Sequence, residues 1–141
     1  MSVVALLSWI VTAFFGLYLL AVWLIENDVT DKGATASRLP APVIGGHALL
    51  ALAGLGCWVI HLVSGSDKWG WAALGTLALI IVLGLTMLTR WIPVHRGVVE
   101  SGAQAMDFPA ERAFPVPVVA SHGLLAFTTF TLVLLTMLKV R

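Results

Sequence analysis

The chain has 141 residues, of which 60% are hydrophobic and only 11% are charged. Soluble globular domains contain roughly 45–50% apolar and about 25% charged residues, so this composition indicates an integral membrane protein with a single domain. The net charge of +1 offers no basic surface that would neutralise phosphates, so nucleic acid is not expected as a partner. The single cysteine, Cys57, lies in an apolar stretch and is expected to be a small buried side chain.

Four apolar stretches are long enough to cross the roughly 30 Å hydrocarbon core of a bilayer. They are predicted to be membrane-spanning helices at residues 3–25, 42–64, 69–92 and 114–138. The first lacks the positive n-region and small-residue cleavage site of a signal peptide, so we expect it to be retained. Because lipid cannot bond to backbone polar groups, the expected fold is all-α, an up-down-up-down four-helix bundle of two hairpins.

Turn signals and charges separate the four spans. The link at residues 65–68 is short enough to make the second and third spans antiparallel neighbours. Pro93 follows Arg90 and Trp91, which suit a membrane interface, and it is expected to end the third span. Cationic residues occur at both ends of the predicted bundle, so the loop charges leave the orientation in the membrane open.

One internal repeat relates the second and fourth spans. Residues 40–51 match residues 115–126 at a constant offset of 75, and seven of the twelve positions are identical. Both segments begin with Pro-x-Pro-Val and carry a histidine at the eighth position, His47 or His122. The same offset finds no convincing match between the first and third spans. The chain is therefore predicted to contain two hairpins with a partial repeat, like parallel repeats related by an axis along the membrane normal.

The repeat also predicts where its two histidines lie. The second and fourth spans run in the same direction as diagonal partners, so His47 and His122 are expected at matching depth and facing each other. Small residues follow them on the same helix faces and favour either close packing or a bound ligand. Two neutral imidazoles from opposite sides suit a haem iron. The candidate cofactor-binding residues are His47, Ala51, Gly54, His122, Ala126 and Thr129, with the two histidines as metal ligands.

This pattern resembles the four-helix membrane b-type cytochromes, in which histidines of different transmembrane helices hold haem b. The resemblance covers the second and fourth spans through the repeated motif Pro-x-Pro-Val-x-x-x-His-x-Leu-Leu-Ala. It implies haem b on His47 and His122 in a small subunit, for example of a respiratory complex, that serves electron transfer or quinone-linked redox. His61 follows His47 by 14 residues, a spacing similar to that of two-haem members. The sequence departs from them at the equivalent position of the fourth span, Thr136.

Three other interpretations of the histidines stay open, namely helix packing, a non-haem metal site, and a role in proton transfer or quinone binding. Each imidazole can bond to a carbonyl or hydroxyl across the bundle and only stabilise helix packing. A non-haem zinc or iron site would draw its ligands from His47, His95, Glu100, Asp107, Glu111 and His122, although none of these pairs has the spacing of a metal motif. His61, near a span end, is expected to be interfacial, and His95 is expected to lie solvated in a loop.

The sequence also limits the class of protein. It contains no phosphate-binding glycine loop, no nucleophile elbow and no carboxylate within a span, so we expect neither a transporter nor an enzyme that acts on its own. The alternative function is a cofactor-free accessory subunit that packs against a larger complex through Gly75, Ala78 and Gly84. Expected partners are the bilayer, other membrane subunits or further copies of the chain, and quinone. The expected location is the cell membrane.

Overall fold

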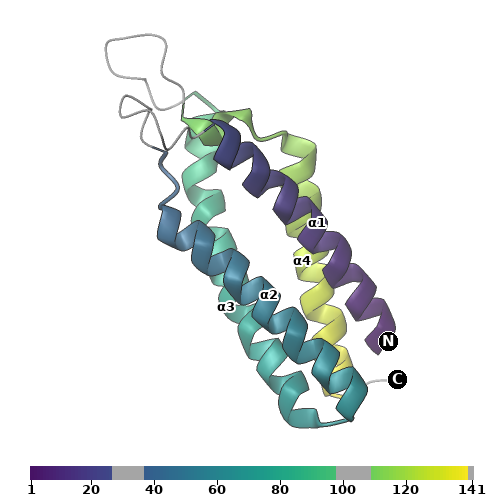
Figure 1. Ribbon diagram of the computed structural model, residues 1–141. Coiled ribbons are helices and arrows are strands. Elements are labelled where there is room, and N and C mark those ends of the chain that lie inside the picture. Colours follow the sequence, from purple (N-terminus) through teal and green to yellow (C-terminus); the bar gives the residue numbers. More distant parts are fainter. Residues whose placement is uncertain (27–36, 98–108, 140–141) are drawn as a thin grey trace.

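The computed structural model describes residues 1–26, 37–97 and 109–139, and these residues form a bundle of four long helices and one short 3-10 helix (Figure 1). The elements are α1 (Ser2–Glu26), α2 (Ala41–Ser64), α3 (Asp67–His95), η1 (Ala110–Ala113) and α4 (Val116–Met137). Each of the four α-helices is long and apolar enough to cross a membrane. The expected all-α, multi-pass four-helix fold is confirmed.

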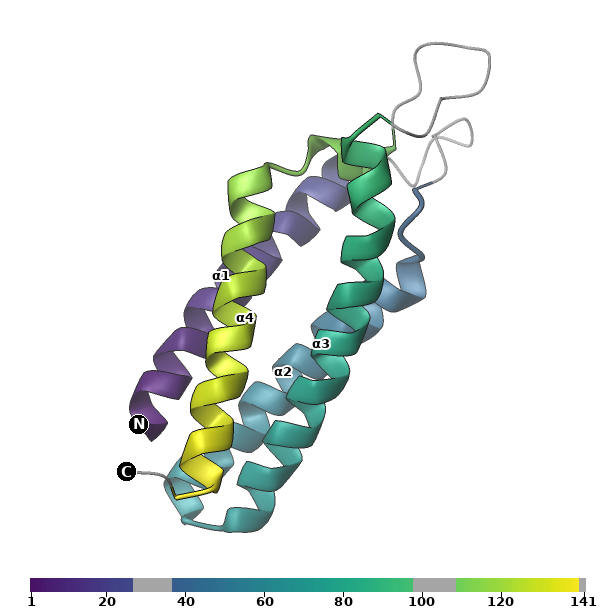
Figure 2. The same cartoon turned by 180° about the vertical axis from the view of Figure 1, so that it is seen from behind.

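The four helices pack as two close pairs. α1 lies against α4 and α2 lies against α3, whereas contacts between α1 and α2 and between α3 and α4 are sparser. Figures 1 and 2 show the α1–α4 pair beside the α2–α3 pair from opposite sides. The second pair follows from a tight turn, in which Gly65 adopts a φ of 68° and donates its N–H to the His61 carbonyl. Glycine reaches this left-handed conformation without a steric penalty.

The two Pro-x-Pro motifs start α2 and α4 in the same way. Pro40 and Pro115 are the N-cap residues, both with extended backbone, and a second proline lies in the first turn of each helix. Proline fits this position because the N–H groups of a first turn have no partner within the helix. His47 and His122 consequently lie six residues after the first residue of their helices, about 9 Å along each axis.

The end of α3 differs from the prediction, because the helix continues through Pro93 to His95. Proline removes one backbone hydrogen bond and does not by itself unwind a final turn that has other support. Here the N–H of Arg96 still bonds to the Ile92 carbonyl at 3.0 Å. The indole N–H of Trp91 also donates to the Glu111 carbonyl at 2.9 Å, which fixes the last turn against η1.

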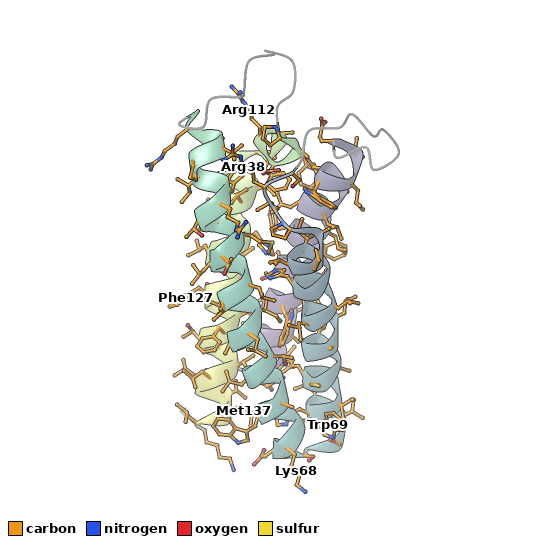
Figure 3. All side chains as sticks on the ribbon, turned by 90° about the vertical axis from the view of Figure 1, so that its left-hand side faces the viewer. Arg38, Lys68, Trp69, Arg112, Phe127 and Met137 are labelled. Atoms are coloured by element: carbon orange, nitrogen blue, oxygen red, sulfur yellow. The ribbon has the colours of Figure 1, made fainter. Side chains whose placement is uncertain are left out.

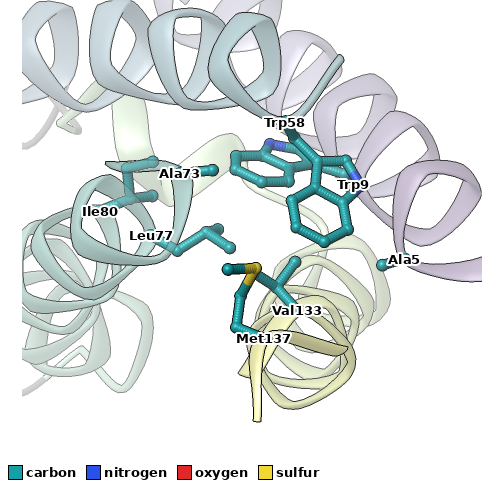
Figure 4. Packing of buried hydrophobic residues seen from close by; sticks show 8 residues of the cluster. All are labelled: Ala5, Trp9, Trp58, Ala73, Leu77, Ile80, Val133 and Met137. Carbon is teal, nitrogen blue, oxygen red and sulfur yellow. The ribbon is translucent and has the colours of Figure 1, made fainter. Parts of the chain in front are cut away.

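Most of the buried apolar side chains lie toward the end of the bundle where α2 turns into α3. Figure 4 shows this core, which consists of Ala5, Trp9, Trp58, Ala73, Leu77, Ile80, Val133 and Met137. The side chain of Trp58 is fully buried, and its indole N–H donates to the Ser2 carbonyl at 3.3 Å. All four helices contribute to this core, so it joins the two helix pairs at this end.

A polar cluster, defined as Trp23, Ser37, Arg38, Trp91 and Glu111, closes the opposite end. Glu111 is fully buried, and its carboxylate accepts hydrogen bonds from Ser37 Oγ at 2.9 Å and from the Arg38 N–H at 2.8 Å. The indole N–H of Trp23 donates to Ser37 Oγ at 2.9 Å. The polar cluster thus ties the residues before α2 to those before α4. Figure 3 shows Arg38 at this end and Lys68 at the other.

Burial reveals a second repeat, between α1 and α3. At an offset of 68, six of the nineteen positions of residues 5–23 are identical in residues 73–91. The buried residues of α1 are Ala5, Trp9, Thr12 and Trp23, and their equivalents Ala73, Leu77, Ile80 and Trp91 are all buried in α3. In α2 and α4, Gly54 and Trp58 match the buried Thr129 and Val133 at the offset of 75.

The repeat therefore covers both helices of each hairpin. The offset of 75 finds no match between the first and third spans because the repeat of these two spans has an offset of 68. The two offsets, 68 and 75, differ by seven residues. Counted between equivalent positions, the connection between α3 and α4 is longer than the connection between α1 and α2 by this number of residues. In this repeat α1 corresponds to α3 and α2 corresponds to α4. The close pair α1–α4 therefore corresponds to the close pair α3–α2, and the bundle has an approximate twofold axis along its length.

The first prediction tests this topology by cysteine labelling. In a Cys57→Ala background, Arg96→Cys and Arg38→Cys should react with a membrane-impermeant maleimide from one face of the membrane, and Lys68→Cys from the other. All three side chains are exposed, and the helix bounds place residue 68 at the end opposite to the other two. Reaction of residues 68 and 96 from the same face would contradict the four-span bundle.

Candidate functional site

The two repeated histidines lie in a part of the bundle that has no fully buried side chain. This histidine layer is defined as residues 13–22 of α1, 41–53 of α2, 81–90 of α3 and 117–128 of α4. All of its residues are partly or fully exposed, whereas buried residues bound it on α1 and α3, namely Thr12, Trp23, Ile80 and Trp91. The layer is about 15 Å deep along the bundle.

Within the histidine layer, His47 and His122 face each other across the α2–α4 diagonal. Their ring centres are 6.1 Å apart and the ring planes are inclined by 57°. In a metal site held by two imidazoles, each ligating nitrogen lies about 2 Å from the metal and each ring centre about 1 Å further out. Two ring centres are then about 6 Å apart. The separation of the two rings would therefore suit imidazoles that hold one metal ion between them.

The His122 ring is fixed by a backbone group of α1. Its Nδ1 lies 3.0 Å from the carbonyl oxygen of Thr12. A carbonyl can only accept a hydrogen bond, so Nδ1 carries the proton and Nε2 is left with a free electron pair in the neutral ring. This is the tautomer that ligates through Nε2.

The His47 ring is held differently. Its Nδ1 is buried and has no hydrogen-bond partner among the described residues. The backbone of Ile80 on α3 lies near this ring, and no hydrogen bond joins it to Nδ1. A buried polar atom without a partner is rare in folded proteins and calls for an explanation.

The other four candidate residues do not all line the space between the histidines. Ala51 is half-buried and packs against the core, and Ala126 is half-buried on α4. Gly54 is buried, and a Cβ there would lie 3.0 Å from Trp9 Cζ2 and Thr76 Oγ1. The indole of Trp9 therefore occupies the space beside Gly54 and leaves none for a ligand.

Thr129 belongs to a hydroxyl cluster between α1 and α4. Its side chain is 1% exposed, donates to the Leu125 carbonyl at 2.8 Å and lies 2.8 Å from Ser8 Oγ and 3.4 Å from Thr12 Oγ1. These contacts satisfy the hydroxyl within the protein. Thr129 thus joins two helices below the histidine layer, and its geometry gives it no part in holding a cofactor.

The remaining histidines lie away from the pair. His61 Nδ1 is 2.9 Å from the Ser66 carbonyl, and its ring packs on Trp58 beside the α2–α3 turn. His95 is the exposed last residue of α3, stacked on Trp91 rather than in a loop. No group of three or more histidine, cysteine, aspartate or glutamate side chains able to hold a metal occurs in the described part of the chain. Glu100 and Asp107 lie outside that part.

Two glycines also contact the histidines, which the sequence pattern did not indicate. A Cβ on Gly16 would lie 2.9 Å from His122 Cε1, and one on Gly84 would lie 3.4 Å from His47 Cε1. Gly84 therefore faces the site, contrary to the outward face expected for it, whereas Gly75 and Ala78 are exposed. The sequence signal for the two site glycines is the match of Gly16 with Gly84 at the offset of 68.

Comparison with known proteins gave no relative. The chain matched no family model, no curated protein and no solved structure.

The second prediction concerns the hydroxyl cluster. Thr129→Val should lower the free energy of unfolding in detergent by about 0.6–1.7 kcal/mol, the range for interhelical hydrogen bonds in membrane proteins. The matched control is Thr128→Val, because Thr128 is exposed and bonds to the Leu124 carbonyl of its own helix. Equal unfolding free energies for the two variants would show that the α1–α4 pair does not depend on this cluster.

Proposed function

We propose that this chain is a small integral membrane subunit that holds one haem b between His47 and His122 and serves electron transfer or quinone-linked redox. The observation that carries the proposal is the opposed pair of imidazoles, with ring centres 6.1 Å apart, inside a layer without buried side chains. Intramembrane ionisable residues are costly to place in lipid and mark functional sites by default. Two of them at equal depth, from a repeated motif, favour one shared ligand.

The residues present fit a bis-imidazole ligand set. The Thr12 carbonyl fixes His122 as the tautomer whose Nε2 is free to ligate. His47 contributes a second imidazole whose Nδ1 makes no hydrogen bond within the described residues. A haem held in this way supplies one-electron transfer. The protein residues supply ligation, ring orientation and an apolar surrounding that excludes water.

The exposed apolar surface supports a membrane setting. Large apolar side chains are exposed along all four helices, among them Phe14, Leu52, Val82 and Phe127. Such surfaces need lipid or other membrane subunits as neighbours. The proposed partners are therefore the bilayer of the cell membrane, other membrane subunits or further copies of this chain, and quinone.

The alternative proposal is a cofactor-free accessory subunit. It is favoured by one specific contact, the hydrogen bond from His122 to the Thr12 carbonyl, since interhelical polar bonds also stabilise bundles without any ligand. This interpretation accounts for His122 but leaves His47 Nδ1 unexplained. The two proposals make opposite predictions for the visible spectrum.

The third prediction tests haem binding directly. Protein purified in detergent from haem-replete cells should show a Soret band and a reduced-minus-oxidised change of a six-coordinate low-spin haem. His47→Ala and His122→Ala should each abolish the low-spin signature, because a site that loses one axial ligand becomes five-coordinate or loses its haem. For the same reason, the visible spectrum of the double variant should show no greater loss of low-spin haem than that of either single variant.

His61→Ala and His95→Ala are the matched controls, since neither ring contacts the pair, and their spectra should equal that of the unmodified protein. Unchanged haem in the His47→Ala, His122→Ala double variant would overturn the ligand assignment. A colourless wild-type protein from haem-replete cells would favour the accessory subunit.

A further inference from the structure

The two histidines contact equivalent pairs of residues on α1 and α3. In an α-helix, the carbonyl of residue i and the residue at i+4 lie next to each other on one face. The first carbonyl–glycine pair is Thr12 with Gly16, and the second is Ile80 with Gly84. At the offset of 68, Thr12 occupies the position equivalent to Ile80, and Gly16 the position equivalent to Gly84. The same repeat that pairs the histidines therefore also pairs their surroundings.

The first carbonyl–glycine pair holds His122. Nδ1 bonds to the Thr12 carbonyl at 3.0 Å, while Cε1 of the same ring lies where a Cβ on Gly16 would be 2.9 Å away. A real Cβ almost never comes so close to another carbon, so any side chain at position 16 would push the ring outward. Because Gly16 has no side chain, the His122 ring can approach α1 closely enough to reach the Thr12 carbonyl. A side chain at position 16 would cover this carbonyl.

The second carbonyl–glycine pair surrounds His47 more loosely. The backbone of Ile80 lies near the ring, and Cε1 lies 3.4 Å and Nδ1 lies 3.9 Å from where a Cβ on Gly84 would stand. This is ordinary van der Waals separation. The His47 ring therefore presents the same edge to its carbonyl–glycine pair as His122 does, but from slightly further away, and its Nδ1 stops short of the hydrogen bond.

We propose that Thr12 with Gly16 and Ile80 with Gly84 are positioning residues that orient the two imidazoles. The Thr12 carbonyl takes the Nδ1–H of His122, and each glycine leaves room for one ring to approach its helix, so the rings are held with Nε2 free for a shared ligand. The inference rests on the proposed function, because it specifies how the two ligands of that site are oriented. His122 makes this bond in the structure, and the His47 ring lies against Gly84, the equivalent of Gly16.

The fourth prediction reads the tautomers without haem. In cofactor-free protein labelled with ¹⁵N-histidine, in a His61→Asn, His95→Asn background, the His122 signal should be that of a ring protonated at Nδ1. Gly16→Ala should shift the His122 signals and leave those of His47 in place. Gly84→Val should disturb His47 alone, and Gly84→Ala should have a small effect because its Cβ has room.

Gly75→Ala and Gly123→Ala are the controls, because a Cβ at either position meets nothing within 4 Å. They change helix propensity as Gly16→Ala does but should leave both tautomers unchanged. The Gly84 series tests the same idea on the other helix pair, so it stays informative if Gly16→Ala loosens the bundle. Unchanged His122 signals in folded Gly16→Ala would overturn the inference.

The haem-loaded protein separates this inference from the proposed function. Loss of an orienting partner typically weakens metal binding by about 10- to 100-fold, so Gly16→Ala and Gly84→Val should lower haem affinity by that factor and the control variants should not. Wild-type protein that binds no haem, with the tautomer shifts as expected, would overturn the proposed function and support the positioning of the rings. Haem affinity unaffected by both substitutions would overturn the positioning role.

Discussion

The arrangement of this bundle depends on placing two imidazoles inside an apolar layer that lipid surrounds. Neither lipid tails nor apolar side chains offer hydrogen bonds, and the backbone carbonyls of a helix are already engaged with N–H groups four residues on. A glycine one turn after a carbonyl exposes it to a ring on the neighbouring helix. In both close pairs, α1 with α4 and α3 with α2, a histidine of one helix lies against a glycine of the other.

The duplicated hairpin turns this local requirement into a symmetric site. An approximate twofold axis brings equivalent side chains to the same depth on opposite sides, so a single histidine per hairpin yields an opposed pair. Elsewhere in the core, equivalent positions of the two hairpins carry different residues with different contacts. Trp9 fills the space beside Gly54, while the equivalent position of α4, Thr129, bonds to Ser8. The cores at the two ends then hold the histidine layer between them.

The sequence predicted the four spans and the proximity of the histidines because both follow from long-range periodic signals: apolar length and a Pro-x-Pro motif that sets helix register. It did not predict the extent of α3, since Pro93 was treated without the contact of Trp91 with Glu111. It also missed Gly16, Gly84 and the polar cluster around Glu111. These depend on which helix faces which, and an apolar helix in lipid carries little amphipathic signal to indicate this.

The most direct test of the proposed account is the electron paramagnetic resonance spectrum of the oxidised, purified protein, with the haem content measured per chain. The account predicts the low-spin ferric signal of bis-imidazole ligation at one haem per chain, because one chain contributes both histidines to a single site. A high-spin five-coordinate signal, or one haem shared by two chains, would contradict the assignment of His47 and His122 as the two ligands of one iron.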